Sequence, residues 1–185
     1  DMRTLAAFDV GSGKVVRRYV AGNDWEEFEL QPKWDRLVLV GWYEAEAWVY
    51  RLSSGEFLGK VDLWPDDRPA AFMGWGYAMM DDEHLAIGIQ GIKDGASGAY
   101  VVVGNVADLT IEGEYYLGGI EMNDVDVMKE GDGIVLAYTN HANAMCGEVW
   151  WIDTRSGEKG IGIDFCEVAD GRNFGAVTIP EIGVF

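Results

Sequence analysis

Val-Trp-Trp-Ile-Asp-Thr-Arg-Ser-Gly-Glu-Lys, residues Val149 to Lys159, is the stretch that decides the fold class. Four apolar residues that favour β-structure run into Asp-Thr-Arg-Ser-Gly, where turn-forming residues are concentrated. Gly157 tolerates a positive φ, so the stretch predicts a strand, a type I turn that ends in a left-handed glycine with a G1 bulge, and a returning strand. We therefore expect a β-hairpin here.

The same hairpin sequence recurs along the chain. Phe8–Lys14 reads Phe-Asp-Val-Gly-Ser-Gly-Lys and Tyr50–Glu56 reads Tyr-Arg-Leu-Ser-Ser-Gly-Glu, and both align with the first stretch on the Ser-Gly pair without a gap. Gly55 and Gly157 are 102 residues apart, so a degenerate copy that lacks Ser-Gly is expected near position 106. The hairpins are predicted near residues 5–20, 47–64, 99–117 and 147–164.

A second marker alternates with the hairpins. Aspartates at intervals of 47, 50 and 38 residues each stand in a turn before an apolar strand, where a carboxylate can cap backbone N–H groups: Asp35, Asp82, Asp132 and Asp170. Leu37–Tyr43 is predicted as a strand covered on both faces, His84–Gln90 as a further apolar strand, and Lys93–Gly98 as a flexible loop.

Repeats of roughly 40 to 50 residues with four strands each are typical of β-propeller blades. The predicted fold is therefore all-β, a propeller of about four blades in a single domain, residues 1–185. The chain begins with the outer two strands of a blade and ends with the inner two. Joined halves would close a four-bladed ring, and unjoined halves would make the chain a slice of a longer propeller. A β-sandwich or a β-barrel is the alternative fold.

The hairpin segments resemble those of quinoprotein-like propeller repeats, in which an apolar strand meets Asp-x-x-Thr/Ser-Gly-Lys/Glu. Val101–Asp108 is similar to another bacterial propeller repeat that is rich in valine and isoleucine. The resemblance covers about a third of the chain and implies architecture only, because propellers of many functions share this hairpin. Quinone-dependent dehydrogenases also carry a vicinal cysteine pair and a regular tryptophan pattern. This sequence has neither, so the resemblance implies no quinone cofactor.

Composition excludes several classes of partner. The formal net charge of −18 would repel phosphate backbones and anionic lipid, which disfavours nucleic-acid and membrane-surface binding. No apolar run approaches the roughly 20 residues of a membrane helix, so no membrane insertion is expected. Basic partners and cations remain compatible with this charge.

Two cysteines, Cys146 and Cys166, flank the Val149–Lys159 hairpin. Counting outward from the turn pairs position 153 with 159, 150 with 162, and finally 146 with 166. Opposed cysteines of this kind come close enough for a disulfide, and two buried free thiols are the alternative. A bridge would place the protein in an oxidising, extracytoplasmic compartment.

Ligand contacts are expected at one rim of the predicted channel. A loop that joins the second and third strands of its blade carries three candidate residues, Asn140, His141 and Asn143. The same rim collects four carboxylates that would crowd in a narrow channel and favour a bound Ca²⁺: Glu44, Glu46, Asp66 and Asp67. Solvated loops are the plainer interpretation of both groups.

Two further polar sites have structural interpretations. His84 beside Asp81 is expected to be a half-buried polar cap, with metal binding as the alternative. Asn123–Asp126 resembles a calcium loop at first sight, but it lacks the glycine and the distal glutamate of an EF-hand, and its alternation favours a strand with one polar face.

The chain has eight tryptophans, which suggests stacking on sugars. Trp42, Trp48, Trp150 and Trp151 lie in apolar strands and are expected to pack between blades. Four others lie nearer loops and are the candidates for glycan contacts: Trp25, Trp34, Trp64 and Trp75.

Neither a nucleophile motif nor a phosphate loop nor zinc-ligand spacing is present, so the sequence favours a noncatalytic binding or interaction module over an enzyme. Its ligand would be a protein, a small molecule or a glycan at the rim loops. The alternative is a carbohydrate-binding or carbohydrate-active propeller that uses the rim carboxylates and tryptophans. Self-assembly is expected if the propeller is open.

Overall fold

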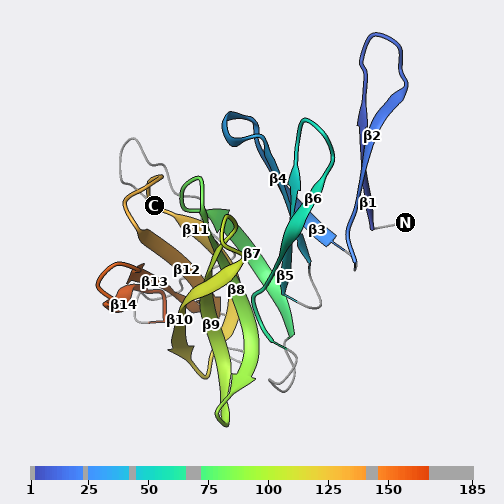
Figure 1. The fold of residues 1–185 in the computed structure, drawn as a ribbon. Helices are drawn as coiled ribbons and strands as arrows, with labels where there is room; N and C mark the ends of the chain where they lie inside the picture. Colours follow the sequence, from blue (N-terminus) through green and yellow to red (C-terminus); the bar gives the residue numbers. More distant parts are fainter. Residues whose placement is uncertain (1–2, 23–24, 42–44, 66–71, 141–145, 167–185) are drawn as a thin grey trace.

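The structure is a computed structural model that describes residues 3–22, 25–41, 45–65, 72–140 and 146–166. In these ranges the strands form one two-stranded ribbon and three four-stranded antiparallel sheets, each with its strands in chain order (Figure 1). The ribbon consists of β1 (Thr4–Phe8) and β2 (Val15–Val20). The first sheet consists of β3 (Trp25–Gln31), β4 (Arg36–Gly41), β5 (Glu46–Arg51) and β6 (Phe57–Asp62). The second consists of β7 (Phe72–Met79), β8 (His84–Lys93), β9 (Ala96–Asn105) and β10 (Thr110–Gly118). The third consists of β11 (Glu121–Val127), β12 (Ile134–Asn140), β13 (Gly147–Asp153) and β14 (Lys159–Asp164).

The fold is therefore all-β, with blade-like sheets. A short 3-10 helix, η1 (Pro32–Trp34), connects β3 to β4. None of the helical residues described forms a segment long and apolar enough to cross a membrane.

The second strand of each sheet is covered on both faces. In β4, Leu37, Val38 and Leu39 are fully buried, and the run Val135–Thr139 of β12 is buried throughout. Continuous Val, Leu and Ile sequences suit such strands, because both alternating faces lie in apolar surroundings. The sequence interpretation of Leu37–Tyr43 is thus correct over the described residues of β4.

The sheets stack face to face through separate apolar clusters. One cluster joins β3–β6 to β7–β10, with Val49 and Leu63 packed against Ile87 and Ile89. A second joins β7–β10 to β11–β14, and a third holds the β1–β2 ribbon on the other face of β3–β6. A fourth cluster, of Leu136, Tyr138 and Val149, lies on the far face of β11–β14.

The hairpins β1–β2, β5–β6, β9–β10 and β13–β14 share one turn conformation. In three of them a glycine at the fifth turn position has a positive φ, +67° at Gly13, +78° at Gly55 and +76° at Gly157, and its N–H bonds the carbonyl of the first turn residue. In β9–β10 the corresponding residue is Leu109, with φ +60°. The predicted degenerate copy therefore exists. Its turn is centred at residue 107, and the position that glycine occupies in the other hairpins is residue 109, not the predicted position near 106.

A polar side chain at the first turn position caps the backbone. Asp153 Oδ1 accepts from the Arg155 N–H at 2.9 Å, and its Oδ2 accepts from the Ser156 hydroxyl at 2.9 Å. In the degenerate copy, Asn105 Oδ1 accepts the N–H groups of the second and third residues after it, at 2.8 and 2.9 Å. The cap therefore persists where the Ser-Gly pair is lost.

The β5–β6 hairpin has Arg51 at this capping position, and an aspartate from another turn replaces the missing carboxylate. Asp35, in the turn before β4, accepts the Ser53 N–H at 2.6 Å and the Ser53 hydroxyl at 2.5 Å. Leu52 N also donates to the Asp35 carbonyl at 2.8 Å. The two turns of this sheet are therefore joined through one residue.

We expect the free energy of unfolding of Asp153→Asn to fall less steeply than that of the wild type as the pH is lowered. The hydrogen bonds from the Arg155 N–H and the Ser156 hydroxyl lower the pKa of Asp153 from its usual value. A lowered pKa contributes stability above the unfolded pKa of about 3.9, and this contribution disappears as the pH falls through the folded value. Urea denaturation from pH 6 to pH 2.5 should give a shallower decline for the variant. Equal slopes would contradict the capping role.

The predicted register of the β13–β14 hairpin is wrong by one residue near its turn. Position 153 does not face 159: Ile152 pairs with Lys159, because Asp153 belongs to the five-residue turn. A bulge between Val149 and Trp150 then adds one residue, so that the outer pairs recover the predicted count. Cys146 and Cys166 consequently form the predicted disulfide, with Cα atoms 5.2 Å apart.

Two other local predictions are corrected by the structure. Lys93–Gly98 is not a flexible loop: β8 and β9 pair as far as Lys93 and Ala96, around a two-residue turn in which Asp94 and Gly95 both have positive φ. Asp-Gly favours this type I′ hairpin turn. Before β8, Asp81 rather than Asp82 caps the backbone. Asp132 caps the Ile134 N–H at 2.8 Å, whereas Asp170 lies outside the described residues.

Candidate functional site

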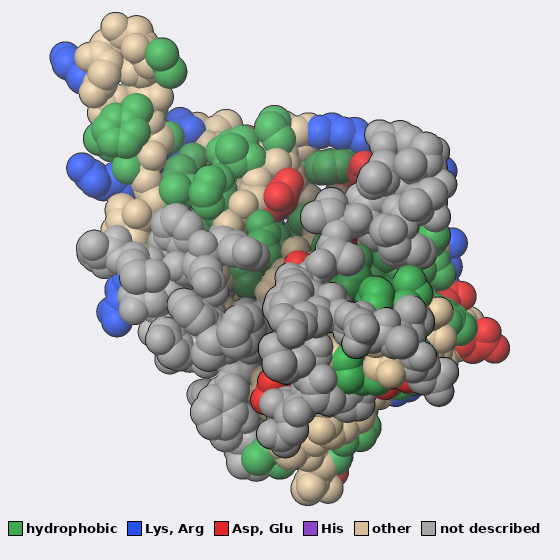
Figure 2. Space-filling view, turned by 180° about the vertical axis from the view of Figure 1, so that it is seen from behind, with side chains coloured by type: hydrophobic (Ala, Val, Ile, Leu, Met, Phe, Trp, Pro, Cys, Tyr) green, Lys and Arg blue, Asp and Glu red, His purple; other side chains and the backbone are tan. Residues whose placement is uncertain are grey.

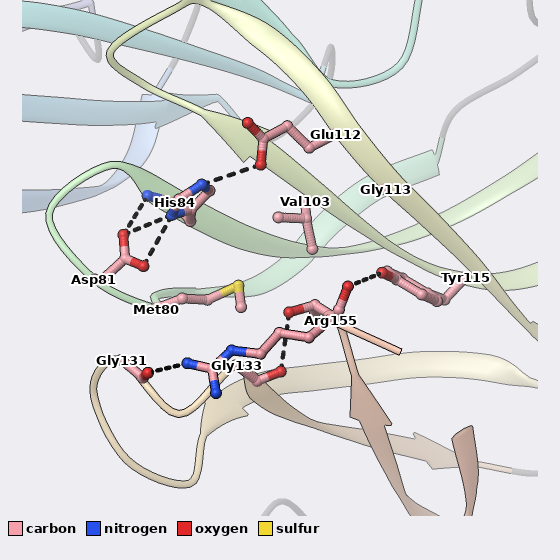
Figure 3. Close-up of a pocket in the computed structure, with 11 residues that line it drawn as sticks. Met80, Asp81, His84, Val103, Glu112, Gly113, Tyr115, Gly131, Gly133 and Arg155 are labelled. Atoms are coloured by element: carbon pink, nitrogen blue, oxygen red, sulfur yellow. Dashed lines mark hydrogen bonds and ion pairs between the residues drawn. The ribbon is translucent and has the colours of Figure 1, made fainter. Parts of the chain in front are cut away.

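A cavity of about 240 Å³ opens between the β7–β10 and β11–β14 sheets, and we take it as the candidate site (Figure 3). Five separate segments line it, and one of them, β9, supplies Val103. The β7–β8 turn supplies Met80, Asp81 and His84, and β10 supplies Glu112, Gly113 and Tyr115. The β11–β12 turn supplies Gly131 and Gly133, and the β13–β14 turn supplies Thr154 and Arg155.

His84 lies between two carboxylates on one wall of the cavity (Figure 3). Its Nδ1 is 2.7 and 2.8 Å from the two Asp81 oxygens, and its Nε2 is 3.0 Å from Glu112 Oε2. Asp81 also accepts the N–H groups of Glu83 and His84 at 2.8 Å each, which fixes the carboxylate in the turn. Asn105 donates to the other oxygen of Glu112 at 2.9 Å.

This arrangement favours a protonated imidazole. Burial lowers the pKa of His84, but the hydrogen bond and charge of Asp81, together with the charges of Glu112 and Glu83, outweigh it and raise the pKa above its ordinary value. Burial likewise opposes ionisation of Asp81, but its backbone and His84 hydrogen bonds hold the pKa of this carboxyl below its usual range. When His84 is protonated, its two ring nitrogens can donate to Asp81 and Glu112, and the wall becomes a carboxylate–imidazolium–carboxylate chain.

The opposite wall is built from two turns of the β11–β14 sheet. The Arg155 guanidinium donates to the Gly131 carbonyl at 2.5 Å, and the Thr154 hydroxyl donates to the Gly133 carbonyl at 3.0 Å. Gly133 has φ +79°, and a Cβ there would lie 3.0 Å from Arg155 Nε, so glycine lets the arginine lie across the turn. The arginine is thereby held at the mouth of the cavity.

Direct hydrogen bonds join the two walls. The Gly131 N–H donates to the Met80 carbonyl at 2.8 Å, and the Tyr115 hydroxyl donates to the Thr154 carbonyl at 3.3 Å. These bonds connect the β7–β10 sheet to the β11–β14 sheet beside the cavity. A small polar ligand would find acceptors on one side, a guanidinium on the other and the Tyr115 ring between the sheets.

The predicted rim residues are distributed differently. Glu46 is 6% exposed at the start of β5 and forms an ion pair with Lys60. Trp64 is 4% exposed and packs edge-on against Tyr100 with ring centroids 5.0 Å apart. Asn140 ends β12, and Trp25 begins β3.

The other predicted site residues, Glu44, Asp66, Asp67, His141 and Asn143, lie outside the described residues. Their ligand roles, and those of Glu46, Trp64, Asn140 and Trp25, stay predictions. The Asn123–Asp126 segment belongs to β11, as the alternation predicts. Across the described ranges, no group of three or more His, Cys, Asp or Glu side chains is arranged to hold a metal ion.

The sequence predicted His84 to be a half-buried polar cap. Its side chain is half-buried, with 29% exposed, but the ring pairs with the Asp81 and Glu112 carboxylates, and Asp81 caps the backbone. Sequence reasoning did not identify Glu112 or Arg155 as members of a site. The cavity joins residues from 80 to 155, and only the packing of two sheets brings them together. The run Asp81-Asp82-Glu83-His84 was the one available signal.

No protein-family model matches this sequence, and no curated protein is similar to it at a significant level. Among solved structures, a Kuenenia stuttgartiensis hydrazine synthase is similar to this chain, with a TM-score of 0.65 and 12% sequence identity over 88% of this chain. The likeness is one of fold. Hydrazine synthase contains β-propeller domains, and the four-stranded antiparallel sheets of this chain are consistent with propeller blades. The match covers 44% of the hydrazine synthase chain, so this chain spans less than half of it.

Proposed function

We propose that this chain is a noncatalytic binding module that takes a small polar ligand in the cavity between the β7–β10 and β11–β14 sheets. The observation that carries the proposal is the convergence of five chain segments on one cavity with charged groups on both walls, Glu112 and His84 opposite Arg155. Concave sites with a few fixed polar groups are the usual form of small-ligand sites.

The state of His84 supports binding rather than catalysis. A general base needs a free nitrogen lone pair within reach of its substrate, and both ring nitrogens of His84 face carboxylates. The Thr154 hydroxyl is committed as a donor to Gly133, and no base contacts it in the described part of the chain. The wall therefore serves better as fixed charge than as a proton carrier.

A neutral sugar is the second, more specific candidate. Tyr115 offers an aromatic ring, Glu112 offers acceptors and Arg155 offers donors, a combination that matches the faces and hydroxyls of a pyranose. The cavity of about 240 Å³ suits a ligand of monosaccharide size. Sugar hydrolysis is a further proposal that depends on the rim carboxylates and tryptophans.

The test uses neutral hexoses and N-acetylhexosamines as probes, in isothermal titration with the full chain. Arg155→Met and Glu112→Gln should each weaken binding at least tenfold, about 1.4 kcal/mol. Arg51→Met removes an exposed arginine from a different sheet and should leave the affinity unchanged, as should Asn140→Ala at the predicted rim. Absence of binding by every probe would remove the sugar candidate. Loss of binding in Asn140→Ala alone would move the site to the rim loops.

The scaffold itself we propose to be a β-propeller of about four blades, in which the three sheets are whole blades and β1–β2 is the outer half of another. The shared hairpin turn and the apolar clusters between successive sheets support it. The Cys146–Cys166 disulfide supports an extracytoplasmic location. Protein or glycan partners, and Ca²⁺ at the rim carboxylates, belong to the same proposal.

A further inference from the structure

Successive outer hairpins pack on one another in a repeated way. The β1–β2 hairpin contacts the β5–β6 turn, where Tyr19 donates to the Leu52 carbonyl at 2.9 Å. The β5–β6 hairpin meets β9–β10 where Gly59 lies under Leu109, so closely that a Cβ on Gly59 would come within 2.1 Å of it. The β9–β10 hairpin meets β13–β14 through Tyr115 and Thr154. Among the described residues, the β5–β6 and β9–β10 hairpins thus each have a neighbouring hairpin on both sides.

The first hairpin presents a free apolar face. Leu5, Ala7 and Tyr19 pack onto the β3–β6 sheet, whereas the neighbouring positions point the other way. Phe8 and Val20 are each 60% exposed, and Val16 is 59% exposed. Large apolar side chains gathered on one ribbon mark an interaction surface.

The charge of this hairpin is opposite to that of the rest of the protein. Residues 3–20 contain four basic residues, Arg3, Lys14, Arg17 and Arg18, against one acidic residue, Asp9, a net charge of +3. The whole chain carries −18, so the remainder carries −21. Figure 2 shows the hairpin projecting from the body with hydrophobic and basic side chains along it.

The last hairpin presents an apolar hollow. On the far face of β11–β14 a cavity of about 370 Å³ lies among Met128, Ile134, Leu136, Val149, Trp151 and Ile163. Leu136 and Val149 are buried at its floor, while Met128, Trp151 and Ile163 are half-buried. It lies on the face of β13–β14 opposite to the one that packs on β7–β10.

We propose that the β1–β2 hairpin of one copy docks its Phe8, Val16 and Val20 face onto this hollow of a second copy. The contact would continue the hairpin-on-hairpin packing that the chain already repeats. The basic hairpin would meet the acidic body of its partner, which favours association. The two surfaces lie at opposite ends of the stack of described strands, and among these strands neither surface is paired with the other (Figure 1). The interface is head-to-tail, with a different surface on each partner.

The test is solution mass by light scattering and sedimentation of the full chain over a range of concentrations. Wild type should exceed the 20.4 kDa monomer mass as concentration rises. Val16→Asp with Val20→Asp should abolish association by charging the docking face, and Ile163→Asp should do so by charging the hollow. Val10→Asp is the control: it adds one negative charge at the hairpin turn, where the side chain is 98% exposed, and should weaken association by less than tenfold.

Mixing separates this proposal from closure within one chain. The hairpin variant retains its hollow and the Ile163→Asp variant retains its hairpin, so an equimolar mixture should form a complex of twice the monomer mass. A wild type that stays monomeric at every concentration would overturn the proposal, and so would a mixture that stays monomeric while both variants have the wild-type circular dichroism. Should Ile163→Asp fail to fold, Gly162→Asp, at an exposed position beside the hollow, replaces it.

Discussion

Replacing Ile87 with alanine is expected to lower the free energy of unfolding by about 3 kcal/mol. Ile87 is fully buried in β8 and belongs to the cluster that joins the β3–β6 and β7–β10 sheets. Removing three side-chain carbons there loses apolar burial and leaves a cavity, because stacked sheets on both sides limit collapse. Chemical denaturation followed by tryptophan fluorescence would measure the loss.

The matched control is Leu30→Ala, which removes a similar volume from β3, where the side chain is 46% exposed. We expect that variant to lose less than about 1 kcal/mol, since less surface leaves water when it folds. Equal losses in the two variants would mean that the β3–β6 and β7–β10 sheets do not share a packed core.

Reduction of Cys146–Cys166 is expected to cost about 3 kcal/mol of stability. The bridge closes a loop with a sequence separation of 20 residues that contains the whole β13–β14 hairpin. Opening it restores conformational freedom to the unfolded chain, which moves the equilibrium towards unfolding. Denaturation with and without a thiol reductant would measure the difference.

A double variant, Cys146→Ser with Cys166→Ser, provides the control. It should unfold like the reduced wild type and should not respond to reductant. Two free thiols in the untreated wild type, found by titration, would contradict the bridge.

Local chemistry explains which parts of the fold could be predicted from the sequence. The hairpin around Gly157 follows from residues within one turn: a capping side chain at the first position and a residue that tolerates positive φ at the fifth. The Cys146–Cys166 pairing was also correct, although for a partly accidental reason. A turn longer by one residue and a bulge beside Trp150 shift the register in opposite directions and cancel.

Two turns were predicted inaccurately because their residues do not match the Ser-Gly pattern. Leu109 adopts the positive φ that glycine has elsewhere, so a search for Ser-Gly passes over the β9–β10 turn. Asp94-Gly95 is a strong hairpin signal, and it was hidden among the small residues of Lys93–Gly98.

The candidate site was beyond the reach of the sequence for a different reason. Its walls meet where the β7–β10 and β11–β14 sheets pack together, and hydrogen bonds from Gly131 to Met80 and from Tyr115 to Thr154 join them there. No periodicity within one strand records which turn faces which, since that depends on the stacking of whole sheets. In the sequence, Arg155 looks like an ordinary turn residue, and only the structure shows that its side chain lies against Gly133.

Asp35 couples the two turns of the first four-stranded sheet, β3–β6. Its carboxylate holds Ser53 in the outer turn while its own backbone forms the inner turn, with a φ of +54°. Neither turn can fray without releasing hydrogen bonds of the other. The β3–β4 and β5–β6 hairpins should therefore open together as a single cooperative unit.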